Sequence, residues 1–396
     1  MKLTYSWLKE FLDTQASPEM IATTLTAIGL EIESVRSLGA GLESFTIAEI
    51  METSPHPDAE KLRVCRVLTH TGERQIVCGA PNARAGIKVI LADIGDMIPT
   101  NGMQIKAAKI RGVESNGMLC SARELGIGTD DNGIMELPAA TPVGAKAVDV
   151  LGLNDTLFDI SITPNRGDCL GVVGIARDLA AAGLGTLKLP SIHDTTHPNN
   201  DAIALTLTTP DCPHFVVYRL DGVINGESPQ WLQARLTSVG LRSISTLVDI
   251  TNYFTLTYGR PLHVYDAEKL TGGITVRLSH ESESFAALND KNYTLPVGLC
   301  VIADDAGVLG IGGVMGGSAS GCTATTTSVI LEAAWFDPLA IARAGRATMI
   351  DSDARYRFER GVDPAGTAPY AAAAAQMILE LCVQAWKQRS HGNALS

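Results

Sequence analysis

The sequence predicts a multidomain α+β protein, in which a small β-barrel is inserted into a small α/β domain and a mixed α/β domain follows. The chain has 396 residues, and single hydrophobic cores rarely grow beyond about 250–300 residues, so we expect more than one domain. Hydrophobic residues make up 45% and charged residues 19%, a composition typical of folded chains. Short strand-like runs replace a mixed helix-and-strand pattern between residues 41 and 150.

Residues 1–40 and 151–190 are predicted to form the small α/β domain, which is therefore discontinuous. In the first segment Ser17 is a good helix N-cap, and Pro18 suits the first helical position. Gly29 then ends the helix before an alternating, strand-like run. The second segment reads as one strand, a turn and one helix, which complements the first segment.

Residues 41–150 hold five short strand-like runs separated by turn residues. So many short strands in one region indicate a small Greek-key barrel of the OB-fold type. The predicted strands cover residues 45–53, 62–70, 74–80, 88–95 and 104–110.

A polar stretch at 191–201 lacks any periodic apolar pattern, and we interpret it as a linker. Residues 202–385 then combine strand-like runs with three helices and are predicted to form the second α/β domain. Prolines mark the expected starts of these helices, because proline favours the first helical turn. They are Pro229, Pro338 and Pro364.

Charge and cysteine content exclude several classes of protein. The net charge of −12 argues against a chain that coats nucleic acid nonspecifically, although it allows a local basic patch. The eight cysteines are scattered without a CxxC pair, so we expect reduced thiols in a cytoplasmic protein. We expect no membrane contact, because the chain has neither a long apolar run nor a secretion signal at its start.

Three blocks in the barrel region resemble a known RNA-binding module. Residues 56–67 (HPDAEKLRVCRV), 76–95 and 110–127 are similar to the tRNA-binding OB module of synthetase β subunits and of free-standing tRNA-binding proteins. An OB barrel can hold a nucleic-acid backbone in its groove. A basic face that is merely solvated remains the alternative, since this module also serves as a scaffold. The candidate phosphate contacts are Lys61, Arg63, Lys106, Lys109 and Arg111.

Further blocks extend the resemblance to most of the chain. Residues 160–180 (ISITPNRGDCLGVVGIARDLA) are similar to the segment that follows this module in bacterial phenylalanyl-tRNA synthetase β subunits. Residues 242–266, 307–317, 329–335 and 352–364 resemble the B3/B4 editing domain of the same family. The chain is thereby identified as similar to the amino-terminal portion of these β subunits.

This resemblance implies hydrolysis of mischarged Tyr-tRNA(Phe). A pocket that accepts phenylalanine rejects tyrosine, which merely adds a hydroxyl, by only about two orders of magnitude, so a second, hydrolytic site is needed. By resemblance, Glu332 accepts the hydrogen bond of the phenol, and His263 and Asn252 lie near the ester and its water. The family's Thr-Asp-Ala set appears here with serine first. The implied substrate-binding residues are Glu332, Gly316, Gly317, Ser352, Asp353 and Ala354.

The residues themselves leave alternatives open. Glu332 lies in an otherwise apolar run, and a buried, unpaired carboxylate is costly. It therefore either pairs with Arg355, Arg357 or Arg360, or serves a ligand. A lone histidine such as His263 could equally be a packed loop residue.

For cofactors and partners, the resemblance implies none in this portion, and ATP and Mg²⁺ for the whole enzyme. His56 and Asp58 lack a third ligand, so we expect no metal site. The expected partners are tRNA(Phe) and the α subunit in an α2β2 assembly, the α subunit supplying the aminoacylation site. Residues 386–396 depart from the family's pattern. A non-catalytic tRNA-binding scaffold and a free-standing trans-editing hydrolase remain as alternatives.

Overall fold

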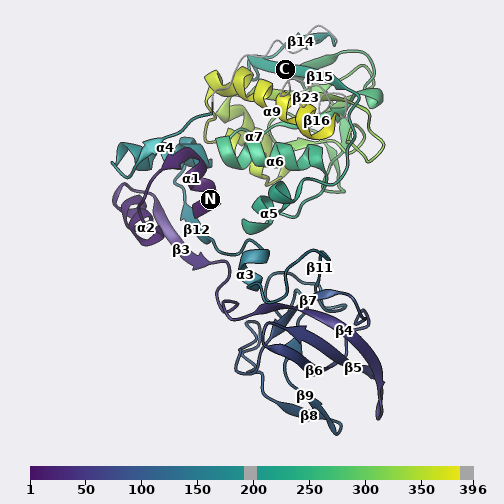
Figure 1. Cartoon of the computed structure of the whole chain (residues 1–396). Coiled ribbons are helices and arrows are strands. Elements are labelled where there is room, and N and C mark those ends of the chain that lie inside the picture. The colour runs from purple at the N-terminus through teal and green to yellow at the C-terminus, as the bar shows by residue number, and fades with distance from the viewer. Residues whose placement is uncertain (191–202, 384–396) are drawn as a thin grey trace, which may run out of the picture. The chain divides into compact units, whose positions relative to one another are not determined.

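The computed structural model describes residues 1–190 and 203–383 (Figure 1). The expected linker at 191–201 and the expected tail at 386–396 lie outside the described residues. The chain forms two compact units of mixed helices and sheets: Met1–Val35 with Leu157–Ser396, and Arg36–Thr156. The domain boundaries expected from the sequence stay predictions.

The amino-terminal part of the first unit is a small α/β layer with a three-stranded sheet in the order β1-β12-β3. Ser17 caps α2 by accepting a hydrogen bond from the Met20 N–H, Pro18 opens this helix, and Gly29 follows it with φ +92°. These three local signals are confirmed. The elements are β1 (Lys2–Thr4), α1 (Tyr5–Phe11), β2 (Leu12–Asp13), α2 (Pro18–Ala27), β3 (Glu31–Ser37), β12 (Thr156–Ser161), a 3-10 turn (Gly167–Cys169), α4 (Val172–Ala181) and β13 (Thr186–Leu187).

The second unit is built on one antiparallel sheet in the order β10-β7-β4-β5-β6, with β11 also paired to β7. Four of the five predicted runs form strands of this sheet. The fifth prediction, 104–110, is wrong over most of its length, because only Ala108–Ile110 are strand and they pair in a separate hairpin. The elements are β4 (Thr46–His56), β5 (Ala59–Thr69), β6 (Gly72–Cys78), β7 (Lys88–Ala92), β8 (Ala108–Ile110), β9 (Val113–Ser115), β10 (Met118–Leu119), β11 (Glu136–Leu137) and α3 (Ala147–Val150).

Individual hydrogen bonds link β6 to the end of β9 and to the residue that follows it. The Asn116 N–H donates to the Gln75 carbonyl at 2.9 Å, and the Val77 N–H donates to Ser115 Oγ at 3.1 Å. Within the described residues, no strand ladder closes the sheet between β6 and β10.

The carboxy-terminal part of the first unit contains two larger sheets. One runs β14-β17-β20-β21-β22, and the other runs β15-β23-β16 with β23 at its centre. Helices α6 and α9 pack against each other and against the second sheet (Figure 1). The elements are β14 (Leu205–Leu207), β15 (His214–Asp221), α5 (Gln230–Ser238), α6 (Thr246–Tyr258), β16 (His263–Asp266), a 3-10 turn (Ala267–Lys269), β17 (Ile274–Leu278), β18 (Ser284–Ala286), β19 (Asn292–Thr294), β20 (Cys300–Ala303), β21 (Val308–Ile311), β22 (Met315–Gly316), β23 (Ser328–Trp335), α7 (Pro338–Thr348), α8 (Asp353–Phe358), a second 3-10 turn (Pro364–Gly366) and α9 (Thr367–Cys382).

Side chains along β23 point alternately to the two faces of its sheet, and this determines which core each of them packs against. Ile330 and Ala334 belong to a core shared with residues of the other large sheet, such as Val301 and Ile311. Because side chains two apart in a strand share a face, Glu332 points toward this same core. The strand therefore carries one carboxyl group into an apolar interior.

Of the three predicted helix starts, Pro338 opens α7, and Pro229 is the N-cap residue directly before α5. Pro364 instead begins a 3-10 turn, and α9 starts only at Thr367. Pro369 consequently lies in the first turn of α9, where its missing N–H removes no intrahelical hydrogen bond.

All eight cysteines lie in the described part of the chain, where none of them forms a disulfide, and seven are buried. Among the described residues, no helix combines the length and the apolar character needed to span a membrane.

Candidate functional site

Strands β16 and β23 place three polar side chains on one face of their sheet. His263 lies directly opposite Glu332 in the antiparallel register, and opposed residues share a face. Tyr265 follows His263 by two residues and therefore points the same way. The sequence reasoning missed Tyr265, although the period of two along residues 263–266 could have indicated it.

A cavity of about 80 Å³ lies against this face. The glycine-rich turn between β21 and β22 and helix α8 enclose it with mostly apolar side chains. Among the residues expected from the sequence, Gly316 and Ala354 line it together with His263 and Glu332. The other lining residues are Pro261, Leu262, Tyr265, Ile302, Gly310, Ile311, Gly313, Val314, Met315 and Phe358.

Glu332 is a buried carboxyl group whose partner is a phenol. The residue is 6% exposed, and the Tyr265 hydroxyl donates a hydrogen bond to Glu332 Oε2. Burial disfavours the charged form and raises the pKa of Glu332 to about 7, while the hydrogen bond from Tyr265 opposes this shift. Near neutral pH this carboxyl group therefore exchanges between two protonation states.

The three arginines considered as partners for this glutamate pair with other carboxylates. Arg355 lies 3.0 Å and Arg360 lies 2.8 Å from oxygens of Glu359, and Arg357 lies 2.9 Å from an oxygen of Asp353. The alternative of a structural ion pair is wrong for the described residues. The carboxyl group in the cavity has no cationic partner there.

His263 is a neutral imidazole with an unused nitrogen. Its ring packs edge-on against Tyr265 with centroids 4.4 Å apart. Nε2 is enclosed and has no hydrogen-bond partner in the described part of the chain. Burial lowers the pKa of His263 to about 4, so the ring is neutral at neutral pH. A Cβ at Gly316 would lie 2.5 Å from His263 Cε1, so only glycine allows this approach.

Four expected residues lie outside the lining of the cavity. Ser352 caps α8 and donates to the Val314 carbonyl at 2.7 Å, so it ties the helix to the glycine-rich turn. The side chain of Asp353 is largely exposed to solvent and forms an ion pair with Arg357. Gly317 follows β22, and Asn252 lies within α6, half-buried. The structure thus brings together His263, Glu332, Gly316 and Ala354, and the other four expected residues do not line the cavity with them.

In the second unit, Lys61 and Arg111 line one open hollow of about 690 Å³ at the tips of two hairpins, β4-β5 and β8-β9. Arg111 donates to the Asp58 carbonyl at 3.0 Å. Lys109 lies 3.9 Å from Glu114. All the basic side chains proposed from the sequence are exposed: Lys61, Arg63, Lys106, Lys109 and Arg111.

His56 holds these hairpin tips together. Its Nδ1 accepts from the Asp58 N–H at 3.1 Å, and its Nε2 lies 2.9 Å from the Ile110 carbonyl. Since Nδ1 accepts, Nε2 carries the proton and donates. Both ring nitrogens are used within the fold, and neither is available to a metal.

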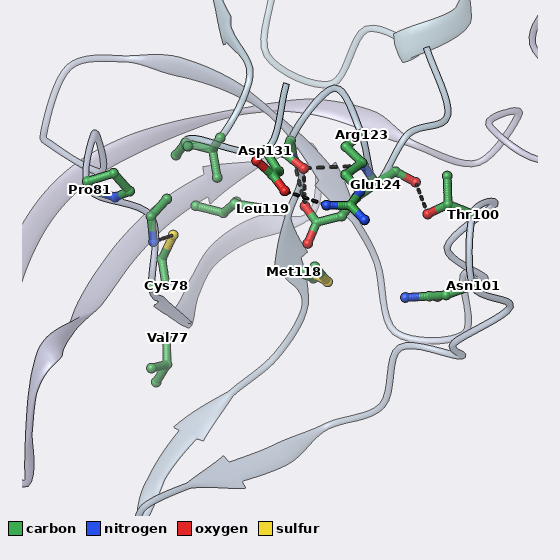
Figure 2. A pocket seen from close by; sticks show the side chains of 15 residues that line it. Val77, Cys78, Pro81, Thr100, Asn101, Met118, Leu119, Arg123, Glu124 and Asp131 are labelled. Carbon is green, nitrogen blue, oxygen red and sulfur yellow. Dashed lines mark hydrogen bonds and ion pairs between the residues drawn. The ribbon is translucent and has the colours of Figure 1, made fainter. Parts of the chain in front are cut away.

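A second hollow of the same unit, of about 580 Å³, escaped the sequence reasoning. Figure 2 shows Arg123 and Asp131, joined as an ion pair, on one side of it, and Cys78 and Pro81 on the other. Buried Ser121 donates to Glu124 through its N–H and its hydroxyl, at 2.7 and 2.8 Å. None of the five basic candidates lines this hollow.

Comparison with known protein families identifies two domains. Residues 211–383 match the model of the B3/4 domain. Residues 45–146 match the family described as "Putative tRNA binding domain". The first match contains the cavity, and the second contains the sheet of the second unit and the two hollows described above.

Curated relatives match nearly the whole chain. A phenylalanine–tRNA ligase β subunit of Paramagnetospirillum magneticum is 51% identical over 387 residues, covering 96% of this chain and 48% of the relative. The corresponding subunit of Rhodospirillum rubrum is 53% identical over 388 residues, with the same coverage. The chain spans about half the length of these relatives. Among solved structures, an N-terminal fragment of a phenylalanyl-tRNA synthetase β subunit from Pyrococcus horikoshii is 17% identical. The match covers 48% of this chain and 62% of the fragment, and its TM-score of 0.28 indicates only a weak structural likeness.

Proposed function

Since the chain belongs to the phenylalanine–tRNA ligase β-subunit family and corresponds to the amino-terminal half of its members, we propose that its B3/4 domain hydrolyses mischarged Tyr-tRNA(Phe). The observation that supports this most is the cavity in which His263, Tyr265 and Glu332 converge. A buried carboxyl group without a cationic partner is costly to keep. This carboxyl group has a function if it accepts a hydrogen bond from a ligand that carries a hydroxyl group at the end of an aromatic ring.

The chemistry of the cavity suits a tyrosyl ester. The ring of the tyrosyl group packs among apolar side chains such as Phe358 and Ile311, and its hydroxyl donates to Glu332. A phenylalanyl ring leaves the same carboxylate without this bond, and a site built around a hydrogen bond discriminates strongly against a ligand that lacks it. The cavity must widen to admit a ring, because about 150 Å³ is the size of an apolar cavity that holds benzene.

Hydrolysis requires a water molecule held beside the ester. His263 is neutral, so its unpartnered Nε2 can hold a water molecule or the tRNA's terminal hydroxyl by a hydrogen bond. No serine or cysteine lines the cavity among the described residues, so we assign the attack to water. Ser352 and the glycine-rich turn support the wall around the ring, and Asn252 is retained as a proposed helper from α6.

The second unit supports tRNA binding in this proposal. Its sheet is proposed to form an OB-type barrel, and the exposed Lys61 and Arg111 at the hairpin tips are proposed phosphate contacts. Cytoplasmic assembly with an α subunit, which brings ATP- and Mg²⁺-dependent aminoacylation, is proposed for the whole enzyme only.

Deacylation assays test the proposal. The purified chain should hydrolyse Tyr-tRNA(Phe) and spare Phe-tRNA(Phe), and Glu332→Ala should lower this discrimination by about 1.5–3 kcal/mol, the usual worth of a hydrogen bond to a charged group. Glu281→Ala, which removes an exposed carboxylate of the same domain, is the control. A folded chain that stays inactive at high concentration would indicate the tRNA-binding scaffold instead.

A further inference from the structure

Tyr265 is a fixed part of the cavity wall. It is 1% exposed, it lies in a paired strand opposite Ile330, and its ring packs against His263. Moving such a side chain would open a void in a close-packed core, which is costly. We therefore expect its hydroxyl to stay on Glu332 Oε2 when a ligand enters, which leaves the other oxygen, Oε1, open to a ligand hydroxyl.

Two phenols donate most strongly to one carboxyl group when that group is ionised. An ionised carboxylate accepts at both oxygens, whereas a protonated one carries an O–H of its own. The titratable groups around Glu332 are His263 and Tyr265 on β16, Cys212 just before β15, and Cys300 on β20. In the described part of the chain none of these is a cation at neutral pH, since burial lowers the pKa of His263 to about 4. The hydrogen bond from Tyr265 is thus the local interaction that favours the ionised form against burial.

We propose that Tyr265 is a positioning residue for Glu332: its hydroxyl holds Oε2, stabilises the carboxylate and leaves Oε1 to accept a hydrogen bond from a para-hydroxyphenyl ligand. This inference rests on the proposed function, because it specifies how that site recognises its substrate class. The opposite role, in which Tyr265 blocks Glu332 and must be displaced, is an outcome of the test.

The test measures binding of free L-tyrosine and L-phenylalanine by calorimetry from about pH 6 to about pH 9, a range that brackets the pKa of about 7 for Glu332. The wild-type preference for tyrosine should rise with pH, with a midpoint near that pKa. In Tyr265→Phe the midpoint should move up by about one unit, so that the preference at pH 7 falls roughly fivefold. Tyr293→Phe, which removes a phenol hydroxyl bonded to Asn289 elsewhere in the domain, should change neither value.

A second variant protects the test against a damaged fold. Glutamine does not ionise. In the double variant that carries Glu332→Gln and Tyr265→Phe, the preference for tyrosine over phenylalanine should therefore not depend on pH. A midpoint that persists there, an unchanged midpoint in Tyr265→Phe, or tighter tyrosine binding by that variant each overturns the inference. So does a wild-type chain without preference for tyrosine.

Deacylation separates this inference from the proposed function. A chain that binds tyrosine with the expected pH dependence but does not deacylate Tyr-tRNA(Phe) contradicts the proposed function and leaves the role of Tyr265 intact. A chain that deacylates Tyr-tRNA(Phe), and whose Tyr265→Phe variant keeps the wild-type midpoint, contradicts the role of Tyr265 alone.

Discussion

Replacing Glu332 by glutamine should change how the stability of the protein depends on pH. The amide has nearly the shape of the carboxyl group, and its carbonyl oxygen can still accept the hydrogen bond from Tyr265. The substitution therefore removes the titration and keeps the main contact. Any cost of burying the amide N–H₂ is independent of pH and does not alter the shape of the curve.

The magnitude follows from the shift in the pKa of Glu332. Burial raises this pKa from its ordinary value of 4.5 to about 7, and about 2.5 units at 1.36 kcal/mol each amount to roughly 3 kcal/mol. Because the folded state holds the proton more tightly than the unfolded state, this contribution is fully present below about pH 4.5. It is lost as the pH rises to about 7. The folded wild-type protein is thus penalised above pH 7, and the glutamine variant is not.

Urea unfolding of both proteins between about pH 4.5 and about pH 8 measures this difference, by linear extrapolation of the free energy of unfolding to water. Relative to the wild type, Glu332→Gln should gain up to about 3 kcal/mol across this range. His263 is present in both proteins, so its titration cancels. Glu281→Gln, at an exposed position, should run parallel to the wild type. If the Glu332→Gln and wild-type curves also run parallel, Glu332 does not titrate near neutrality and the reasoning fails.

Three other substitutions test the surroundings. Gly316→Ala places a Cβ 2.5 Å from His263 Cε1. It should abolish most Tyr-tRNA(Phe) deacylation and lower the unfolding free energy by about 1–3 kcal/mol. Gly226→Ala, with open space around its Cβ, should change neither the deacylation nor the unfolding free energy. Ser352→Ala removes the N-cap of α8 and should lower the unfolding free energy by about 1 kcal/mol in the same urea assay, with Ser352→Thr close to wild type. Arg111→Ala should weaken tRNA binding and reduce the slope of log affinity against log salt by about 1 in a filter-binding titration, and an unchanged slope would contradict a phosphate contact.

Several local features could be read from the sequence because their causes lie within a few residues. Ser17 and Pro18 define the start of α2, and the apolar run around Glu332 is a strand. The partners of Arg355 and Arg357 were readable as well. Each has a carboxylate four residues away, on the same helical face.

Only the tertiary structure determined the hydrogen-bond partner and the burial of Glu332. Its partner Tyr265 is 67 residues away, and they are neighbours because β16 pairs with β23 in one particular register. A shift of that register by one residue would turn the side chains of His263 and Tyr265 to the opposite face. The burial that moves the pKa of Glu332 likewise depends on the sheet β14-β17-β20-β21-β22 and on α8. Burial by segments that are distant in the sequence cannot be read from the local sequence pattern. Residue types and their spacing thus determined the strand and its one carboxyl group. Strand pairing determined which phenol donates a hydrogen bond to that carboxyl group.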